Sequence, residues 1–150
     1  QKLELQEIKP IVVFALSFLK SNFQKKGIRN ELIFKNENIT ARIDSVQITQ
    51  VLFNLLINAI HASPEKSLIK IIVENNDFNL FLKIEDQGTG IPENIKAKIF
   101  EPFFSTKPVN YGCGLGLSVV YGIIKNHNGE IIVQDNFPNG TIFTIIIPLR

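Results

Sequence analysis

The chain has 150 residues, 45% hydrophobic and 20% charged, as expected for one globular domain spanning residues 1–150. A formal net charge of +2 without a basic run argues against a nucleic-acid surface, and no apolar stretch is long enough to span a bilayer. A single cysteine excludes an intramolecular disulfide and, with no signal-peptide pattern, favours a cytoplasmic protein. Because the chain begins with glutamine and lacks methionine, we expect it to be a fragment of a longer protein.

The N-terminal part predicts one helix followed by two strands. Apolar residues recur at helical spacing over residues 10–26, and Gly27 is a suitable residue to end that helix. The segments 31–34 and 39–43 are rich in β-forming residues and flank the polar run 35–38. This pattern is typical of a hairpin, so we expect the two segments to pair with each other.

A second helix and a second hairpin are expected in the middle of the chain. Asp44 or Ser45 is a good N-cap for a helix that runs to about Ser63, directly before a proline. Segments 69–74 and 80–85 are β-rich and are separated by a polar turn.

The last third of the chain contains a long loop between regular elements. A short helix is predicted at 95–99, and the segment 101–113 is long for a connection within a compact domain. A helix over 115–126 and a hairpin of 130–134 with 141–147 complete the chain. The elements together predict an α/β (α+β) two-layer sandwich with a mostly antiparallel sheet and helices on one face.

Asparagines interrupt the apolar surface of the second predicted helix. Asn54, Asn58 and His61 follow one another at spacings of four and three, so they form one polar stripe. A buried amide without a partner costs about 1–3 kcal/mol, so the stripe requires partners. The amide oxygen of Asn58 is a suitable Mg²⁺ ligand, because Mg²⁺ prefers hard oxygens. The alternative is that both amides cap neighbouring loops.

A first glycine cluster follows the predicted strand 80–85. Asp86 is followed by Gly88 and Gly90, which allow the backbone to lie close to a flat ring. The carboxylate could accept a hydrogen bond from an exocyclic amine such as that of adenine. A plain acidic turn is the alternative, and Glu93 stands where a dinucleotide-binding fingerprint requires its third glycine.

A second glycine cluster opens the predicted helix 115–126. Gly112, Gly114 and Gly116 place backbone N–H groups at a helix start, where a di- or triphosphate could bind. Lys107, in the loop before them, would either reach a phosphate or remain a solvated cation. The aromatic residues of the same loop are expected to pack and hold it in place.

Together these segments resemble the ATP-binding catalytic domain of bacterial sensor histidine kinases, a branch of the superfamily (GHKL) that also holds gyrase, mismatch-repair and heat-shock ATPases. The resemblance covers nearly the whole chain. It is carried by an N box at 50–62, a G1 box at 86–92, an F box at 99–107, a G2 box at 112–118 and a further motif at 140–143. The run 118–127 is most similar to the nitrogen-regulation (NtrB-like) type of sensor kinase.

The resemblance implies the Bergerat ATP-binding fold, with ATP and Mg²⁺ as cofactors and an ATP lid over residues 102–113. It implies that Asn58 ligates Mg²⁺, that Asp86 binds the adenine amine and that Thr141 holds a water near the base. The other residues implied to contact nucleotide are Asn54, His61, Ala62, Gly88, Gly90, Ile91, Phe104, Lys107, Gly112, Gly114, Leu115, Gly116 and Leu117. Tyr111 and Cys113 depart from the residues usual in the lid and in the G2 box.

Asn54 separates the branches of this superfamily. The hydrolysing relatives carry a glutamate here as general base, and an amide cannot accept a proton at neutral pH. With Asn54 and Asn58 as the catalytic residues, we therefore expect a kinase that transfers the γ-phosphate rather than a hydrolase.

The phosphoacceptor is expected outside this chain, since neither His61 nor His127 is followed by an acidic residue. The implied partners are an upstream dimerisation and histidine phosphoacceptor domain, with residues 1–9 as a remnant of the connection, and a response regulator receiver domain. No membrane contact by this fragment is expected. The alternatives are a degenerate nucleotide-binding module acting by protein contact and a hydrolytic ATPase.

Overall fold

The computed structural model describes residues 2–102, 104 and 116–149 of the chain. The described elements, in chain order, are β1 (Glu4–Glu7), α1 (Ile8–Phe18), α2 (Lys20–Lys26), β2 (Arg29–Phe34), β3 (Thr40–Ile43), α3 (Ser45–Ala62), β4 (Leu68–Asn75), β5 (Asn79–Glu85), the 3₁₀ helix η1 (Glu93–Lys98), α4 (Gly116–Asn126), β6 (Glu130–Asp135) and β7 (Thr141–Pro148).

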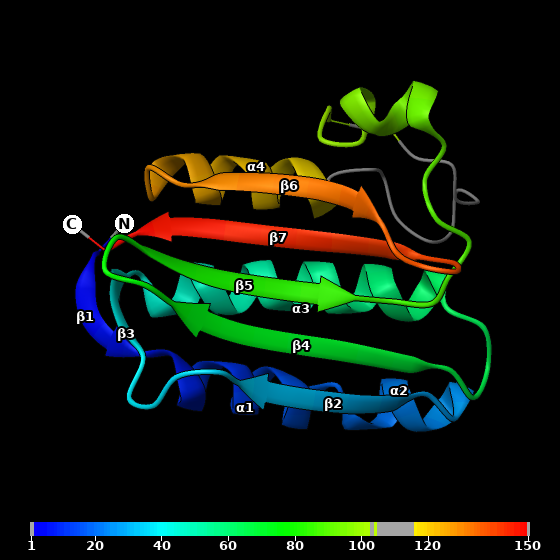
Figure 1. Cartoon of the computed structure of the whole chain (residues 1–150), viewed down its shortest axis with the longest axis horizontal. Coiled ribbons are helices and arrows are strands. Elements are labelled where there is room, and N and C mark those ends of the chain that lie inside the picture. The colour runs from blue at the N-terminus through cyan, green and yellow to red at the C-terminus, as the bar shows by residue number, and fades with distance from the viewer. Residues whose placement is uncertain (1, 103, 105–115, 150) are drawn as a thin grey trace.

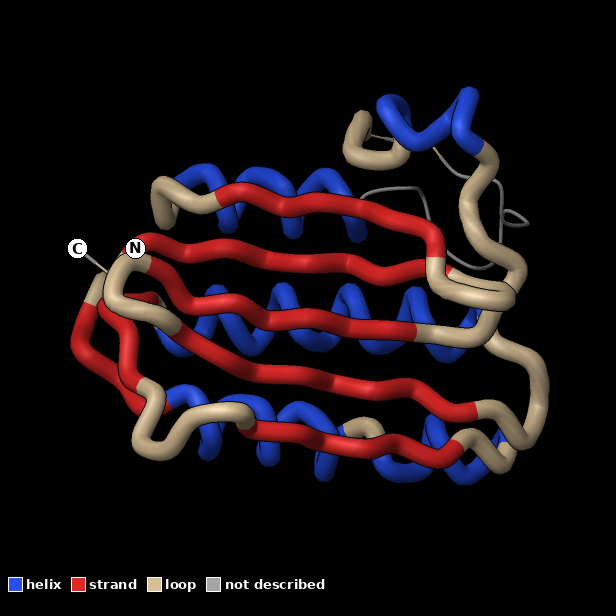
Figure 2. Tube along the Cα trace, in the orientation of Figure 1, coloured by secondary structure: helices blue, strands red, loops and turns tan. Residues whose placement is uncertain are grey.

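The molecule has two layers. Five strands form a sheet in the order β2-β4-β5-β7-β6, and a small second sheet pairs β1 with β3. Among the described strands of this sheet, β2 and β4 run parallel and the other neighbours are antiparallel. The helices α1, α3 and α4 lie along one face of this sheet (Figures 1 and 2). The predicted sandwich of a mostly antiparallel sheet with helices on one face is confirmed.

The core lies between the sheet and the helices. Alternate residues of the three central strands are buried, as expected for strands with one face against the core. They are Ile69, Ile71 and Val73 of β4, Leu80, Leu82 and Ile84 of β5, and Phe143, Ile145 and Ile147 of β7. Ile48, Leu52, Leu55 and Leu56 of α3 are also fully buried. Each such side chain stabilises the fold by roughly 1.5–3 kcal/mol relative to exposure.

The predicted hairpin of segments 31–34 and 39–43 is wrong. β2 instead pairs in parallel with β4, with Arg29 opposite Leu68, and β3 pairs with β1, with Glu4 opposite Ile43. The polar run between them therefore does not connect two paired strands, and its Asn36 accepts a hydrogen bond from the backbone N–H of Asn75. β1 was not expected as a strand, since its side chains are mostly exposed and leave no apolar alternation to detect.

The helix predicted over residues 10–26 is two helices. It begins earlier, at Ile8, and is interrupted at Leu19, whose backbone angles of φ −95° and ψ 10° leave the helical region. Leu19 and Phe23 are both buried, so the interruption keeps both side chains in the core. Gly27 ends the second helix in the left-handed conformation, as predicted.

α3 is capped at both ends. Asp44 accepts a hydrogen bond from the backbone N–H of Gln47 at 3.1 Å, which confirms the predicted N-cap. Backbone N–H groups of Lys2 and Gln47 stabilise the charged carboxylate and lower the pKa of Asp44. At the other end, the Lys26 ammonium of α2 donates to the carbonyl oxygens of Ile60 at 2.8 Å and Ser63 at 2.6 Å. A cation at this position also interacts favourably with the helix dipole.

His127, directly after α4, joins the end of that helix to the start of α3. Its Nε2 accepts a hydrogen bond from the backbone N–H of Asp44 at 3.1 Å, and Nδ1 lies 2.8 Å from the carbonyl oxygen of Ile123. Because Nε2 accepts and a carbonyl can only accept, the ring is neutral, with its proton on Nδ1. The ring is buried, at 4% exposure.

Replacing His127 by phenylalanine is expected to lower the free energy of unfolding by about 1–3 kcal/mol. The apolar ring keeps the volume but leaves the N–H of Asp44 without its acceptor. Urea unfolding followed by circular dichroism measures the change. Glu130→Gln, at an exposed position three residues on, is the matched control and should change little. A loss below about 0.5 kcal/mol, which is the size of an ordinary surface substitution, would show that the hydrogen bond between His127 and Asp44 is not important for stability.

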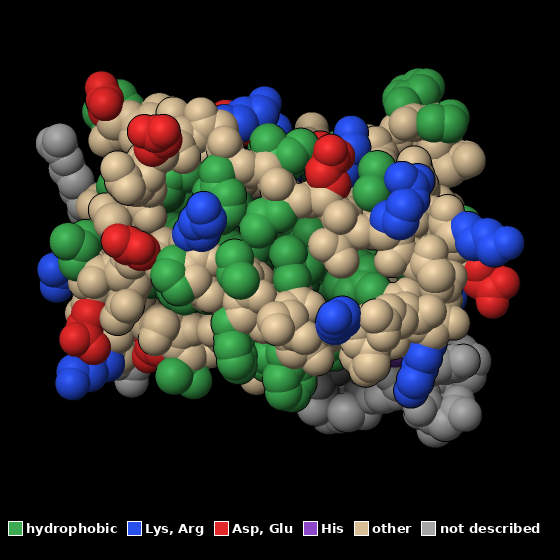
Figure 3. Space-filling model, turned by 90° about the horizontal axis from the view of Figure 1, so that it is seen from below, with side chains coloured by type: hydrophobic (Ala, Val, Ile, Leu, Met, Phe, Trp, Pro, Cys, Tyr) green, Lys and Arg blue, Asp and Glu red, His purple; other side chains and the backbone are tan. Residues whose placement is uncertain are grey.

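Three phenylalanines of α1 and α3 form a cluster in which Phe14 and Phe18 are exposed and Phe53 is half-buried. The rings of Phe18 and Phe53 stack with centroids 5.0 Å apart, and Phe14 lies 6.1 Å from Phe18. Hydrophobic side chains also gather in the middle of the face formed by α1 and β2 (Figure 3). Among the residues that the structure describes, no helix has both the length and the hydropathy needed to cross a membrane.

Candidate functional site

Asp86 is a buried carboxylate at the end of β5. The residue is only 3% exposed. Its Oδ1 accepts hydrogen bonds from the backbone N–H groups of Gly88 at 2.9 Å and Thr141 at 3.1 Å. Burial raises the pKa of Asp86, and the two hydrogen bonds oppose that effect by favouring the charged form. A buried carboxylate held by backbone donors is a fixed acceptor for a donor on a ligand.

The turn between β6 and β7 lies against the backbone of Asp86. Asn136 donates from Nδ2 to the carbonyl oxygen of Asp86 at 2.7 Å, and Thr141 accepts from the backbone N–H of Asp86 at 2.9 Å. Gly140 has a φ of +114°, and a Cβ at this position would overlap the Asp86 carbonyl oxygen. Asn136 was not among the residues predicted to matter, because its partner is 50 positions away in the sequence.

Gly88, in the segment that follows β5, lies against the end of α3. A Cβ at Gly88 would overlap the carbonyl oxygen of Ala62, so only glycine allows the two backbones to approach so closely. Gly90 adopts a φ of +77°, the left-handed region that favours glycine. Two of the predicted site residues, Ala62 and Gly88, are therefore in direct contact.

Asn54, in the polar stripe of α3, contacts the start of α4. Asn54 donates from Nδ2 to the carbonyl oxygen of Gly116 at 3.0 Å and accepts from Nε2 of Gln50 at 2.9 Å. Asn58, one turn further along, is half-buried, and His61 is exposed. Gln50 was not among the predicted site residues, although its position one turn before Asn54 is the signal that could have identified it.

The remaining predicted residues divide into two groups. Ile91, Phe104 and Leu117 are half-buried and pack against the hydrophobic core. Lys107, Gly112, Gly114 and Leu115 lie outside the described residues, as do Tyr111 and Cys113.

The predicted residues on separate elements meet at one end of the molecule. The end of β5, the start of β7 and the C-terminal end of α3 lie side by side there (Figure 1). The contacts of Asp86 with Thr141, Gly88 with Ala62, and Asn54 with Gly116 connect these elements directly. The arrangement combines a buried acceptor, closely approaching backbones and an amide-bearing helix face.

The donor set fits a cation that takes only part of its ligands from protein. No group of three or more histidine, cysteine, aspartate or glutamate side chains gathers within the described residues. Asn58 would supply one neutral amide oxygen, which suits Mg²⁺ because this ion usually retains waters and phosphate oxygens. A metal site built entirely from side chains is not part of the described structure.

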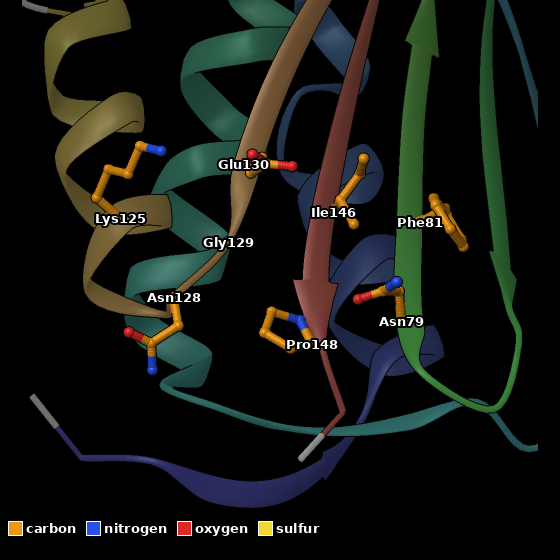
Figure 4. Close-up of a pocket in the computed structure, with 8 residues that line it drawn as sticks. All are labelled: Asn79, Phe81, Lys125, Asn128, Gly129, Glu130, Ile146 and Pro148. Carbon is orange, nitrogen blue, oxygen red and sulfur yellow. The ribbon is translucent and has the colours of Figure 1, made fainter.

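A separate pocket of about 550 Å³ lies at the opposite end of the sheet. Asn79, Lys125, Glu130 and Pro148 are among the residues that line it (Figure 4). Asn79 begins β5 and Pro148 ends β7, whereas Asp86 follows β5 and Thr141 begins β7. The pocket is therefore about the length of a strand, roughly 20 Å, from the carboxylate and does not belong to the same site.

Comparison with known protein families decides the identity of this arrangement. A family model described as histidine kinase-, DNA gyrase B- and HSP90-like ATPase matches residues 43–150. The chain belongs to this family. The match includes the residues of the polar stripe, the Asp86 turn and the start of α4, so these residues belong to an ATP-binding domain.

Individual relatives place the chain with the sensor histidine kinases of this family. Sporulation kinase A of Bacillus subtilis is 32% identical over 147 residues, which are 98% of this chain and 24% of the relative. The catalytic domain of histidine kinase ThkA has a TM-score of 0.91 at 33% identity, covering 99% of this chain and 97% of that one. The chain thus has the fold of a histidine kinase catalytic domain.

A third comparison concerns a complex. The structure of ThkA with the response regulator protein TrrA matches with a TM-score of 0.86 at 32% identity, covering 99% of this chain and 42% of that one. The chain spans about a quarter of the length of the curated relative sporulation kinase A. The relatives are sensor kinases of several kinds and do not single out the nitrogen-regulation type.

Proposed function

We propose that this chain binds Mg-ATP and donates the γ-phosphate to a histidine on a separate dimerisation domain. The observation that carries the proposal is the buried Asp86 carboxylate, held by Gly88 and Thr141, at the same end of the molecule as the asparagine stripe. This combination supplies an acceptor for an adenine amine and, close by, amide groups for a metal-bound phosphate.

Each predicted residue has a role in this proposal. Asp86 accepts from the adenine amine, while Thr141 and the turn at Gly140 hold the carboxylate in place. Gly88 and Ala62 bring backbone atoms close to the base. Asn58 ligates Mg²⁺, and the backbone at the start of α4 faces the phosphates. The remaining proposed contacts are those of Asn54, His61, Gly90, Ile91, Phe104 and Leu117 and, beyond the described residues, those of Lys107, Gly112, Gly114 and Leu115.

The chain's contribution to catalysis is positioning. Bound Mg²⁺ would offset charge on the phosphate oxygens. Asp86 orients the nucleotide through its base, and Asn58 sets the phosphate end relative to α3. Among Asn54 and its partners, no group is a base strong enough to activate water, which suits transfer to an acceptor rather than hydrolysis.

The remaining parts of the proposal concern the whole protein. The acceptor histidine would lie on an upstream domain, and a response regulator would be the next partner, as in the complex of the relative ThkA with the response regulator TrrA. Residues 1–9 would lead from that domain and residues 102–113 would form the lid. We further propose a cytoplasmic location and the nitrogen-regulation subtype, the latter on the run 118–127 alone.

Calorimetric titration with ADP and a non-hydrolysable ATP analogue, each with and without Mg²⁺, tests the proposal. We expect saturable one-to-one binding that Mg²⁺ strengthens. Absence of binding at millimolar nucleotide would favour the alternative of a degenerate module that acts by protein contact. Steady release of phosphate from ATP by the isolated chain would favour a hydrolytic ATPase instead.

Replacing Asn58 by alanine is expected to remove the Mg²⁺ dependence of ATP-analogue binding. The variant lacks the proposed oxygen ligand but retains the Asp86 site, so binding without Mg²⁺ should stay within about twofold of the unmodified protein. Titrations at several Mg²⁺ concentrations measure the effect. Asn22→Ala, at an exposed position on α2, is the matched asparagine control. An unchanged Mg²⁺ effect in Asn58→Ala would exclude Asn58 as a ligand.

A further inference from the structure

Gln50, Asn54 and Gly116 form a continuous hydrogen-bonded chain between α3 and α4. Nε2 of Gln50 donates to Oδ1 of Asn54 at 2.9 Å, and Nδ2 of Asn54 donates to the carbonyl oxygen of Gly116 at 3.0 Å. Gln50 and Asn54 are one helical turn apart on α3, whereas Gly116 is the first residue of α4. These hydrogen bonds therefore connect α3, the helix that carries Asn58, to the start of α4.

The donor and acceptor of each hydrogen bond between Gln50, Asn54 and Gly116 follow from the carbonyl group of Gly116. A backbone carbonyl can only accept, so Asn54 has to present its amide nitrogen to Gly116. The amide oxygen of Asn54 then faces Gln50, which has to present its own nitrogen. The orientation of both side-chain amides is thus determined by the hydrogen-bond network.

The two helices also meet at a second polar contact. α4 runs antiparallel to α3, because Gly116 contacts Asn54 while His127, just after α4, contacts the backbone of Asp44. Between these contacts the buried residues Val120 and Ile124 belong to the hydrophobic core. α4 is thus joined to α3 by a polar contact at each end and by the core between them.

We propose that Gln50 and Asn54 are positioning residues that hold the start of α4 at a fixed distance from Asn58. This inference rests on the proposed function, since Asn58 would carry the Mg²⁺ and the start of α4 would face the phosphates. Asn58 follows Asn54 by four residues, about 6 Å along the same face of the helix. A shift of Gly116 relative to Asn54 therefore changes the space available to the phosphates and leaves the Asp86 end unchanged.

Gln50 is the residue that tests this role most cleanly. Its side chain is exposed, so its removal leaves no buried group without a partner and should not affect folding. Gln50→Ala should weaken ADP and ATP-analogue binding about 3- to 10-fold, the effect of one neutral hydrogen bond, with adenosine binding unchanged within twofold. Val46→Ala, at a position 77% exposed on the same helix, is the control.

Two further variants test whether a donor is required at position 50. Gln50→Glu keeps the shape but supplies only acceptors, so it should weaken ADP binding at least as much as Gln50→Ala. Gln50→Lys restores a donor and should recover ADP binding to within about twofold of the unmodified protein. Equal affinities for the glutamate and lysine variants, or an equal loss of adenosine and ADP in Gln50→Ala, would overturn the proposal.

Hydrogen exchange of the nucleotide-free protein tests the contact itself. In a helix the N–H of Val120 bonds to the carbonyl of Gly116, so its exchange reports on the start of α4. Gln50→Ala should accelerate exchange at Val120 about 3- to 10-fold and leave the exchange of core amides in β5 unchanged. Unchanged exchange at Val120 would overturn the proposal whatever the nucleotide data show.

The two measurements separate failure of this inference from failure of the proposed function. If the unmodified protein binds neither adenosine nor ADP, the proposed function fails, and a positioning role for a phosphate site fails with it. If the unmodified protein binds ADP but the Gln50 variants bind it equally well, only the positioning role is overturned.

Discussion

Replacing Asp86 by asparagine is expected to weaken ADP binding on the order of 10- to 100-fold while the fold is retained. The asparagine oxygen can accept the same hydrogen bonds from Gly88 and Thr141 that Oδ1 accepts now. The second carboxylate oxygen becomes an N–H₂ group, which cannot accept from the adenine amine and presents a donor to a donor. The loss therefore falls on recognition of the base rather than on folding.

Calorimetric titration of the variant with ADP measures the loss of affinity, and titration with GDP is the control. Guanine presents a carbonyl where adenine presents its amine, so the asparagine variant should lose far less affinity for GDP than for ADP. Asp77→Asn, in the exposed turn between β4 and β5, is the matched substitution elsewhere. Equal losses for both nucleotides would mean that Asp86 does not distinguish the bases.

The same variant should change how stability depends on pH. Because burial raises the folded-state pKa of Asp86 above its unfolded value, this carboxyl favours folding most at low pH, where it is protonated. That contribution is lost as the pH rises through the unfolded and then the folded pKa. Asp86→Asn cannot titrate, so its stability relative to the unmodified protein should rise as the pH increases from about 3 to 7.

Replacing Gly140 by alanine is expected to lower the free energy of unfolding by about 3 kcal/mol or more. Its φ of +114° is strained for any residue with a Cβ, and that Cβ would overlap the Asp86 carbonyl oxygen. The backbone of Asp86 is not free to move away, because its carbonyl oxygen accepts from Asn136 and its N–H donates to the carbonyl oxygen of Thr141. Relief of the overlap would therefore displace the end of β5 from β7.

Gly122→Ala is the matched control for this substitution and is expected to have the opposite sign. Gly122 lies within α4, and a Cβ there meets no atom within 4 Å, so alanine should stabilise the helix by about 0.5–1 kcal/mol. Chemical unfolding of the two variants under the same conditions gives both values. A loss of less than 1 kcal/mol in Gly140→Ala would show that the turn adapts to a side chain.

The elements predicted correctly are those in which local signals agree. α3 has a capping aspartate, continuous apolar spacing and a following proline, and the pairs β4–β5 and β6–β7 are adjacent strands with polar turns. The strand β2 was predicted, but its pairing partner was wrong. Its sequence pattern would fit either of two partner strands, and its actual partner β4 lies beyond an intervening strand and helix. Strand partners of this kind depend on tertiary packing, which a single-sequence pattern does not contain.

The candidate site divides in the same way. The sequence identifies Asp86, Gly88, Asn54 and Asn58 as candidates because their residue types and spacing are unusual for a loop or an apolar helix. The contacts that hold them could not, since Asn136 reaches Asp86 across 50 residues and Asn54 reaches Gly116 across 62. Whether Asn54 acts on substrate or on the structure is a question of its partners, and its residue type alone does not answer it.

The Lys26 contact with the end of α3 has a consequence for the limits of the folding unit. Recognition of the family begins at residue 43, yet the ammonium that caps α3 comes from α2, and the parallel partner of β4 is β2. A fragment trimmed to the recognised region would lose this cap, turn β4 into an edge strand and expose core residues that now pack against Ile8, Val12 and Phe23. The smallest autonomous unit is therefore larger than the segment by which the family is recognised.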